Sequence, residues 1–341
     1  MGVELEEEAE SRGYARDMCS YARINFGSIF SGKSSEGEVP RPDLLLCTNN
    51  LCDTLTKWYE NLAEIYQVPL ILIDTPYNYR GINKDSLFYI KTQFKDMIGT
   101  IEAITRKKYD YDKFREAAVL SSETSRLWRE VLELAAKKPT PFTSFDAFNY
   151  MTPSVIDRGT KRTLKYYQLL KAELDEKAAL GVAAVPGEKY RLLIDGIPLW
   201  FFLRKLSDTL KEMQASIVSS RYTNSWVLDY DTDCSLEEMM DNMAVTYTRI
   251  WINQSTTYRA DFITRLTEKF AVDGVLYHCN RSCKPASLGQ QQLQREVAAR
   301  TGLPNLLFDG DHCDPRNFSE AQFFNKLQAF MELVINRKQA S

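Results

Sequence analysis

The sequence lacks the apolar run of roughly 18 residues that a membrane-spanning helix needs. Its start is acidic, where a signal peptide requires positive charge before an apolar core: Met1-Gly-Val-Glu-Leu-Glu-Glu-Glu-Ala-Glu10. An excess of basic residues is also missing, because the net charge is -3 and both signs are mixed along the chain. Such a chain has no electrostatic field for holding a phosphate backbone. These absences predict a cytoplasmic protein with neither a membrane nor a nucleic acid as its partner.

The composition is that of an ordinary globular protein, with 341 residues, 44% hydrophobic and 26% charged, which is enough for two or three domains. The chain contains seven cysteines. Because the cytosol keeps thiols reduced and a chain of this length needs no cross-links, these cysteines do not indicate a disulfide framework. Their positions are therefore more informative than their number.

Two segments repeat the same arrangement around a pair of cysteines. In each, a short apolar run ends on a cysteine and a polar turn leads to a second one, as in Pro42-Asp-Leu-Leu-Leu-Cys-Thr-Asn-Asn-Leu-Cys-Asp53 and Asp273-Gly-Val-Leu-Tyr-His-Cys-Asn-Arg-Ser-Cys283. A polar helical stretch and a second apolar run follow both pairs, at 68–74 and at 303–309. The spacing predicts a strand, cysteine pair, helix and strand in each case. Such βαβ units imply parallel strands.

The apolar pattern divides the chain into three predicted domains. Residues 1–83 form an N-terminal α/β lobe, with helices over 3–12 and 17–26, a crossover helix over 53–66 and a strand over 69–73. Residues 84–186 form a helical region interrupted at 139–141 and around Pro153. Residues 187–341 form a C-terminal α/β lobe with strands at 190–198, 215–220, 273–277 and 305–308 and a closing helix over 320–336. The predicted fold class is α/β, with two Rossmann-like lobes that contain parallel sheets and are joined by a helical middle region.

The segment Gly27-Ser-Ile-Phe-Ser-Gly-Lys-Ser34 matches the phosphate-binding pattern G-x-x-x-x-G-K-[ST]. Such a loop requires a buried strand before it and a helix after it. The preceding residues include Arg23 and Asn25, and residues 35–42 contain two prolines and a glycine that no helix accommodates. We therefore interpret the segment as a surface turn rather than as an ATP site.

Six cysteines flank predicted strand ends in the two outer regions, where open α/β sheets gather their ligands: Cys19, Cys47, Cys52, Cys279, Cys283 and Cys313. A four-cysteine zinc site would suit the two close pairs and a structural protein, but it would leave Cys19 and Cys313 unused. Iron-sulfur clusters are also held by thiolates, and six thiolates suit two cubanes with one free corner each. Those corners would take water, substrate or one bridging sulfide. Cys234 has no strand before it and is interpreted as a plain buried cysteine.

Several short segments resemble a known family over nearly the whole chain. They are Ser11-Arg-Gly-Tyr-Ala-Arg-Asp-Met-Cys-Ser-Tyr-Ala22, Cys47-Thr-Asn-Asn-Leu-Cys-Asp53, Lys57-Trp-Tyr-Glu60, Asp74-Thr-Pro-Tyr77, Cys279-Asn-Arg-Ser-Cys283 and Asp314-Pro-Arg316. The sequence resembles the 2-hydroxyacyl-CoA dehydratase and benzoyl-CoA reductase family. The resemblance implies low-potential iron-sulfur clusters in two Rossmann-like lobes, electrons from a separate ATP-hydrolysing activator protein, and a homodimer or a heterodimer with a related chain.

The cysteines divide the family resemblance into two hypotheses. Usual members match at Cys19, Cys52 and Cys283 and bind one [4Fe-4S] cubane, whereas the additional thiols resemble the double-cubane cluster branch: Cys47, Cys279 and Cys313. The main hypothesis is an iron-sulfur oxidoreductase that uses a double-cubane [8Fe-9S] cluster to reduce small, hard-to-reduce molecules. The alternative is a subunit of a 2-hydroxyacyl-CoA dehydratase, which needs a free cluster iron and an acyl-CoA pocket. Family chains usually carry more residues before the segment at Glu10, so the resemblance leaves open whether the first lobe is complete.

Two histidines, His278 and His312, each precede a candidate ligand and are candidates for catalytic proton relay or for hydrogen bonds to sulfur. A purely structural histidine beside a cluster fits the same positions. Arg281 and Lys284 flank Cys283, where they would either offset cluster charge or lie solvated in a loop. No segment carries a recognisable CoA or small-molecule signature, so the sequence does not predict the substrate.

Overall fold

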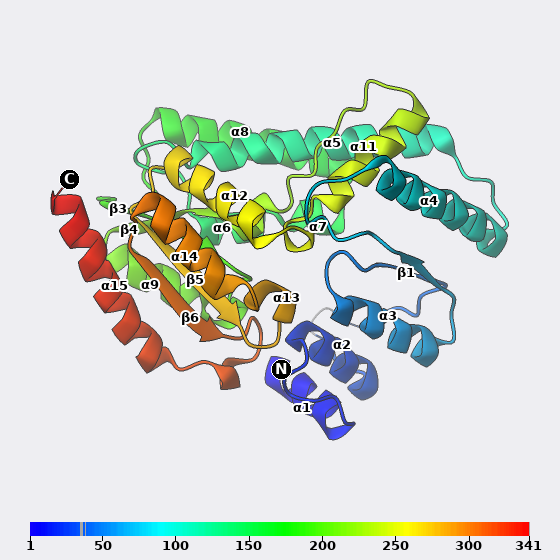
Figure 1. Ribbon diagram of the computed structural model, residues 1–341, viewed down its shortest axis with the longest axis horizontal. Helices are drawn as coiled ribbons and strands as arrows, with labels where there is room; N and C mark the ends of the chain where they lie inside the picture. Colours follow the sequence, from blue (N-terminus) through cyan, green and yellow to red (C-terminus); the bar gives the residue numbers. More distant parts are fainter. Residues whose placement is uncertain (35–36, 38, 341) are drawn as a thin grey trace.

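The computed structural model describes residues 1–34, 37 and 39–340, and contains two parallel sheets (Figure 1). The larger sheet has the strand order β4-β3-β5-β6, with β3 at Tyr190–Asp195, β4 at Ala215–Ser220, β5 at Gly274–Asn280 and β6 at Asn305–Gly310. The smaller sheet pairs β1, Leu45–Thr48, with β2, Leu70–Ile73. All these pairs are parallel, which confirms the predicted fold class. Helices nevertheless make up most of the described chain, and the N-terminal sheet is small.

Both predicted strand, helix and strand units are present. In the first unit, α3 at Asp53–Tyr66 connects β1 to its parallel neighbour β2. In the second, α13 at Lys284–Ser287 and α14 at Gln290–Thr301 connect β5 to β6. The strand β5 continues through Cys279 to Asn280, so Cys279 lies inside the strand and not in the loop after it. Pairing with β6 explains the extra length, because the register runs as far as Asn280 opposite Gly310.

The first two helices pack closely against each other, and their contact corrects one prediction. They are α1 at Gly2–Ser11 and α2 at Ser20–Ser31. A Cβ atom on Gly27 would lie 1.8 Å from the carbonyl oxygen of Leu5, so the close approach requires glycine. Residues 27–31 are therefore helical and not a surface turn, and their amides bond to the preceding helical turn. Part of the segment predicted to exclude a helix, residues 35, 36 and 38, lies outside the described residues.

The middle of the chain is helical, as predicted: α4 at Lys84–Thr105, α5 at Tyr111–Leu134, α6 at Ser144–Tyr150, α7 at Thr152–Ile156 and α8 at Lys161–Ala179. Pro153 lies in the first turn of α7, where proline is tolerated. An unpredicted break separates α4 from α5, because Arg106 is left-handed and Asp110 caps the next helix. Figure 1 shows α5 and α8 running together, with α4 beside α11, Leu236–Thr248. The domain boundary at residue 187 remains a prediction, since α4 contacts this later helix.

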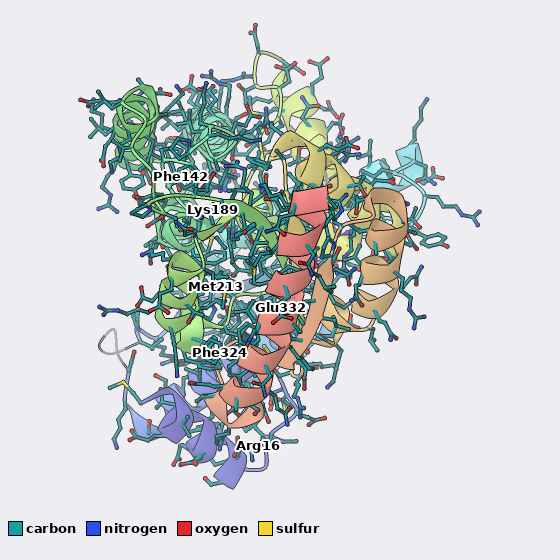
Figure 2. All side chains as sticks on the ribbon, turned by 90° about the vertical axis from the view of Figure 1, so that its left-hand side faces the viewer. Arg16, Phe142, Lys189, Met213, Phe324 and Glu332 are labelled. Atoms are coloured by element: carbon teal, nitrogen blue, oxygen red, sulfur yellow. The ribbon has the colours of Figure 1, made fainter. Side chains whose placement is uncertain are left out.

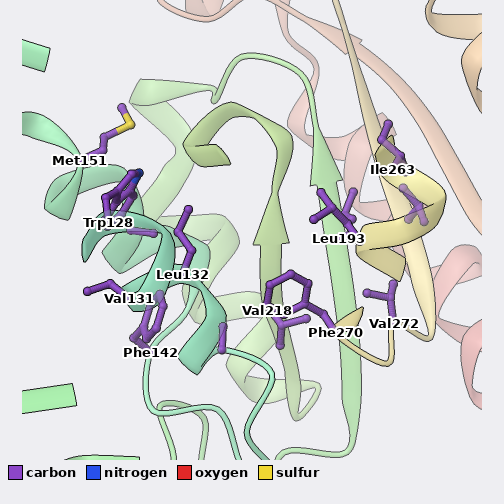
Figure 3. Packing of buried hydrophobic residues seen from close by; sticks show 14 of the residues in the cluster. Trp128, Val131, Leu132, Phe142, Met151, Leu193, Val218, Ile263, Phe270 and Val272 are labelled. Atoms are coloured by element: carbon purple, nitrogen blue, oxygen red, sulfur yellow. The ribbon is translucent and has the colours of Figure 1, made fainter. Parts of the chain in front are cut away.

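The four-stranded sheet has a hydrophobic core on each face because its side chains alternate along every strand. Leu193 and Val218 face the core around Trp128, which also includes α12, Thr256–Lys269 (Figure 3). Leu192 and Ile217 face the second core, which is covered by α9 at Leu203–Glu212 and α15 at Glu320–Ala340. Figure 2 shows α15 lying along one side of the molecule. Within the described residues, no helix combines the length and apolarity that crossing a membrane demands.

Four short helical segments complete the fold: η1 at Trp200–Phe202, α10 at Arg221–Asn224, η2 at Trp251–Asn253 and η3 at Pro315–Asn317. The turn after β3 contains Gly196, whose φ of +115° and close approach to the backbone of His278 require glycine. Whereas η2 follows α11, the segments η1, α10 and η3 and the turn at Gly196 follow the carboxyl ends of strands. The candidate ligands lie there too.

Candidate cluster-binding site

Three of the candidate cysteines are N-cap residues. Cys19 precedes α2, Cys52 precedes α3 and Cys283 precedes α13. Cys52 accepts a hydrogen bond from the backbone N–H of Leu55 at 3.3 Å. The amides of Ala22 and Ala286 approach Cys19 and Cys283 closely enough to oppose the rise in the pKa of each thiol. Backbone donors at helix starts stabilise the thiolate form, which is the form that binds metal.

The same three thiols lie close together with a fourth, Cys313. Burial raises the pKa of Cys283 to about 12, and negative charge on Cys19 or Cys52 raises it further. Burial also raises the pKa of Cys313 to about 12, with contributions from nearby acidic groups that include Cys19. Several thiolates in one partly buried space repel one another, and bound iron would remove that cost because a coordinating thiol is deprotonated outright. The residues therefore fit an iron-sulfur cluster.

The other predicted ligands are less closely associated with this group. Cys47 is buried, donates to the Leu55 carbonyl at 3.7 Å, and among the thiols only Cys52 contributes to the rise in its pKa to about 11. Cys279 lies opposite Asp309 in the sheet, and strand alternation places it on the other face of β5 from Asn280. Cys234, predicted to be buried, is instead partly exposed in the loop before α11, because the chain there packs no strand around it.

Within residues 1–34, 37 and 39–340, no three His, Cys, Asp or Glu side chains converge as ligands of a single metal ion. A tetrahedral zinc site requires four ligands at about 2.0–2.3 Å from one ion. A cubane places its cysteines on different irons and therefore keeps them farther apart. The arrangement gives no support to the zinc alternative and is compatible with a cluster.

His312 takes part in a chain of hydrogen bonds beside Cys19. The amide nitrogen of Asn280 donates to His312 Nδ1 at 2.7 Å, and Ser20 Oγ donates to Asp311 at 2.6 Å. This pattern assigns the ring proton to Nε2, which donates to Ser20 Oγ at 2.8 Å. The same Nε2 lies 3.9 Å from the Cys19 sulfur. Burial lowers the pKa of His312 to about 4, so the ring is neutral near pH 7.

His278, the second candidate relay, has different surroundings. Its Nδ1 donates to the Ile197 carbonyl at 2.6 Å, and its ring stacks on Phe308 with centroids 5.3 Å apart. The residue is 1% exposed. Burial lowers its pKa. These contacts place His278 in the packed sheet, and a catalytic role for it remains a prediction.

Two partly buried tyrosines near the thiols were not predicted as site residues. Tyr21 accepts a hydrogen bond from Trp200 and is hydrogen-bonded to Tyr222. Burial raises the pKa of Tyr222, and charge on Cys313 and Cys283 raises it further. Tyr21 could have been found from its place two residues after Cys19. Tyr222 has no nearby cysteine in the sequence, and only the fold brings it here.

An ion-pair network around the buried Arg23 connects α1 and α2 to the loop that carries Cys313. Arg23, which is fully buried, contacts Glu10 at 2.5 Å and Asp314 at 3.2 Å. Arg316 contacts the same two carboxylates, at 2.6 and 2.8 Å, and Glu6 at 3.2 Å. The network thus helps to position Cys19 and Cys313 relative to each other.

Basic residues lie on the outer side of the Cys283 loop. Arg281 pairs with Asp309, and Lys284 donates to the Arg281 carbonyl at 2.7 Å. Both line a groove of about 640 Å³, together with Arg16 and Arg316. Figure 2 places Arg16 near the end of the molecule formed by α1 and α2. The two cations that were predicted to flank Cys283 therefore face a solvated groove.

Comparisons with known proteins agree with the resemblance. The family model described as 2-hydroxyglutaryl-CoA dehydratase, D-component, matches residues 1–334. The (R)-2-hydroxyisocaproyl-CoA dehydratase alpha subunit of Clostridioides difficile is 40% identical over 98% of this chain and 82% of its own length. The (R)-phenyllactyl-CoA dehydratase alpha subunit of Clostridium sporogenes is 35% identical over 99% of this chain and 82% of its own length. One of the benzoyl-CoA reductase subunits of Thauera aromatica is 29% identical over 97% of this chain and 80% of its own length. The chain therefore belongs to the 2-hydroxyglutaryl-CoA dehydratase D-component family of dehydratase and reductase subunits.

Proposed function

We propose that this chain is an alpha-type subunit of a 2-hydroxyacyl-CoA dehydratase and holds one [4Fe-4S] cluster through Cys19, Cys52 and Cys283. The observation that carries the proposal is the proximity of these three N-cap thiols in one partly buried space. The names of the relatives give further support, because four are dehydratase alpha subunits at 35 to 40% identity. The alternative that the sequence offered thus becomes the leading hypothesis.

The residues of the chain have separate roles in this proposal. The three cysteines bind the cluster, and the backbone amide of Leu55 stabilises the sulfur of Cys52. The Nε2–H of His312 lies beside the sulfur of Cys19 and favours its thiolate form. When bound, the cluster supplies an iron with an open position and carries single electrons at low potential. The partly buried rings of Tyr21 and Tyr222 lie near the thiols and would reduce the access of water to them.

The proposed partners follow from the family. A second, related chain completes the enzyme, since the name "alpha subunit" implies other subunits in the relatives. An ATP-hydrolysing iron-sulfur activator supplies electrons, and a 2-hydroxyacyl-CoA is the substrate. All of these are cytoplasmic in the proposal, and the lobes at 1–83 and 187–341 contribute the ligands from two sides.

The double-cubane reductase is the second candidate, and one observation favours it. Cys313 lies in the same thiol group as Cys19 and Cys283, although the single-cubane proposal does not use it. Against it, Cys47 approaches only Cys52, and the dehydratases named above carry no double-cubane description. The two candidates differ in how many irons and thiols they need.

Anaerobic purification followed by counting iron and acid-labile sulfide tests the proposal. About four irons per chain are expected for one cubane and about eight for the double cubane, whereas a colourless zinc protein would refute both. Cys52→Ser and Cys283→Ser should lose the iron, while Cys47→Ser and Cys313→Ser should keep it. Cys234→Ser is the matched control. Iron loss in the Cys47 and Cys313 variants would contradict the single-cubane assignment.

Activity provides the second measurement. With the related partner chain, the activator and ATP, the wild-type chain should convert a 2-hydroxyacyl-CoA to the enoyl-CoA. The Cys52→Ser variant should still bind the related partner chain but give no product. A chain with about four irons that never dehydrates any 2-hydroxyacyl-CoA would refute the dehydratase proposal while leaving the cluster assignment intact.

A further inference from the structure

A buried polar group without a role in the cluster site lies at the carboxyl end of β3. Asp195 is fully buried, while Arg221 of α10 is 2% exposed and Arg259 of α12 is 4% exposed. Gln290, at the start of α14, is also fully buried. Two guanidinium groups thus share their surroundings with one carboxylate. The group carries an excess of one positive charge, and its side chains are almost entirely buried.

The hydrogen bonds of this group are incomplete. Both oxygens of Asp195 are used, one by Arg221 Nε and the other by Gln290 Nε2 at 2.7 Å. Arg259 Nη2 donates to Gln290 Oε1 at 3.0 Å. Arg221 Nη1 and Arg259 Nε, however, have no partner among the described residues. A buried charged donor without an acceptor is costly, so an additional acceptor would stabilise the group.

Trp251 of η2 holds both guanidinium groups in place. The Arg221 guanidinium lies 3.8 Å from the centre of its ring, and that of Arg259 lies 5.4 Å from it. Such contacts offset part of the charge. An aromatic ring offers no lone pair to a free N–H, so these contacts do not supply the acceptor that Arg221 Nη1 and Arg259 Nε lack.

A cavity of about 210 Å³ adjoins this group. Arg221, Trp251 and Tyr258 line it together with the apolar side chains of Val227, Leu228, Ile250 and Phe262. Asp229 also lines it, but its carboxylate pairs with Arg129. Uncharged polar side chains complete the lining: Asn224, Ser225 and Thr246. The cavity therefore combines apolar, polar and positively charged surface. This combination suits a molecule that is apolar along its length and anionic at one end.

Arg249 adds a second cation at the entrance of the cavity. Its side chain is exposed, and its guanidinium makes no hydrogen bond or ion pair with any side chain or carbonyl in the described parts of the chain. It also lines a neighbouring, larger cavity of about 610 Å³, which includes residues 78–81 of the first lobe. Tyr258 also lines both cavities, so the two cavities are adjacent at Arg249 and Tyr258. An anion that enters through the larger cavity would meet Arg249 before Arg221.

We propose that Arg221, Arg249 and Trp251 form a binding site for the carboxylate of a short organic acid. A guanidinium pairs with a carboxylate through two parallel hydrogen bonds, and the aliphatic wall accommodates the rest of the chain. The volume is below the range of about 300–1,000 Å³ typical of pockets for larger ligands, so a nucleotide does not fit. Burial lowers the pKa of Arg259 to about 9, as does the nearby charge on Arg221. A bound anion would reverse that effect.

The site lies next to the thiols. Tyr222 follows Arg221 in α10 and is close enough to Cys283 and Cys313 for their charges to raise its pKa. Arg259 Nη2 also donates to the Ala286 carbonyl of α13, at 3.5 Å. The carboxylate has two possible sources: a free acid, or the far end of a dicarboxylic acyl thioester. The inference depends on the proposed function only for the second source.

Calorimetric titration of the anaerobically purified full chain tests the site. The probes are 4-methylpentanoate, its uncharged amide and inorganic phosphate. The acid should bind at least about tenfold more tightly than the amide, because the amide cannot accept a charge-assisted hydrogen bond from the guanidinium. Equal binding of acid and amide, or tighter binding of phosphate, would overturn the proposal. Competition by glutaryl-CoA but not by pentanoyl-CoA would assign the carboxylate to the acyl group, and competition by neither would assign it to the free acid.

Two substitutions and a control complete the test. Arg249→Met removes an exposed cation without disturbing the buried group, and Arg221→Lys keeps the charge beside Asp195 but removes the planar fork. Both should weaken 4-methylpentanoate binding at least about tenfold. The control is Arg162→Met, because the side chain of Arg162 lies on α8 and is 83% exposed. This variant should bind the acid as the wild type does. Should Arg221→Lys fail to fold, Arg249→Met decides alone, and unchanged binding there refutes the site.

The iron content of each preparation separates this inference from the proposed function. A chain that contains about four irons but binds acid and amide alike refutes the carboxylate site only. A chain that binds the acid but holds no iron refutes the proposed function only.

Discussion

Glu6 of α1 provides a quantitative test of how the first lobe is held. The residue is fully buried, lies 3.2 Å from Arg316 and 3.7 Å from Arg23, and its Oε1 has no hydrogen-bond partner among the described residues. Burial raises the pKa of Glu6 from 4.5 to about 7, with Arg23 opposing the rise and Asp314 adding to it. The folded chain therefore keeps a proton on Glu6 at pH values where the unfolded chain has lost it.

The sign of the effect follows from proton linkage. Because the pKa is higher in the folded state, the stabilisation is fully present below pH 4.5 and is lost as the pH rises through about 7. The difference between the two pKa values corresponds to a loss of about 3 kcal/mol, of which about 2 kcal/mol falls between pH 5 and pH 8. Glu6→Gln keeps the shape of the protonated acid and cannot titrate. Relative to wild type, the variant should gain about 2 kcal/mol of stability between these two pH values.

Hydrogen exchange measured by mass spectrometry on peptides from α1 and α2 reports the opening free energy of this region at both pH values. The comparison between wild type and Glu6→Gln removes the contributions of all other titrating groups. Glu4→Gln, on the same helix and 76% exposed, is the control and should show no pH-dependent difference. If Glu6→Gln instead loses stability relative to wild type as the pH rises, Glu6 is ionised and paired with the arginines. The reasoning would then be wrong.

Three further outcomes are expected. Arg23→Met breaks buried ion pairs and leaves carboxylates unpaired, so the free energy of unfolding in urea should fall by about 3–5 kcal/mol, and iron content should fall with it. His312→Phe removes the N–H beside the Cys19 sulfur, so the reduction potential measured by redox titration should become more negative while iron content is kept; an unchanged potential would refute this role. Gly27→Ala places a methyl group against the Leu5 carbonyl, so α1 should exchange its amide protons faster than in wild type, whereas the exposed control Gly99→Ala should not have this effect.

Local patterns in the sequence were sufficient to predict most elements. The helix predicted over 53–66 is present as α3, Asp53–Tyr66. The prediction succeeded because both the apolar spacing and the start of this helix depend on residues that are close together in the sequence. The segment at 27–31 was misread as a turn because the residues after it exclude a helix and the helix before it was predicted to end at residue 26. Its helical state depends on the packing of α1 against Gly27, and a contact between two helices leaves no local trace in the sequence.

The site shows the same division between local and distant information. The positions of Cys52 and Cys283 at the starts of helices follow from short spacings that the sequence displays. The length of β5 does not follow from such spacings. Pairing with β6 determines that Cys279 lies inside the strand and which face of the sheet its side chain is on. Tyr222 reaches the thiols through the fold alone, from a segment without any cysteine.

The electrostatics of the site explain why the thiols lie where they do. Two helices of more than ten residues, α2 and α3, begin at Cys19 and Cys52, so their positive ends lie near the same buried space. Positive ends brought together repel each other unless negative charge lies between them, and neutral thiols supply none. The rise in the pKa of the thiols by burial shows that the chain alone does not hold them as thiolates. In the proposed cluster site, iron would offset the cost of burying the thiolates, and the negative charge of the thiolates would offset the positive helix ends.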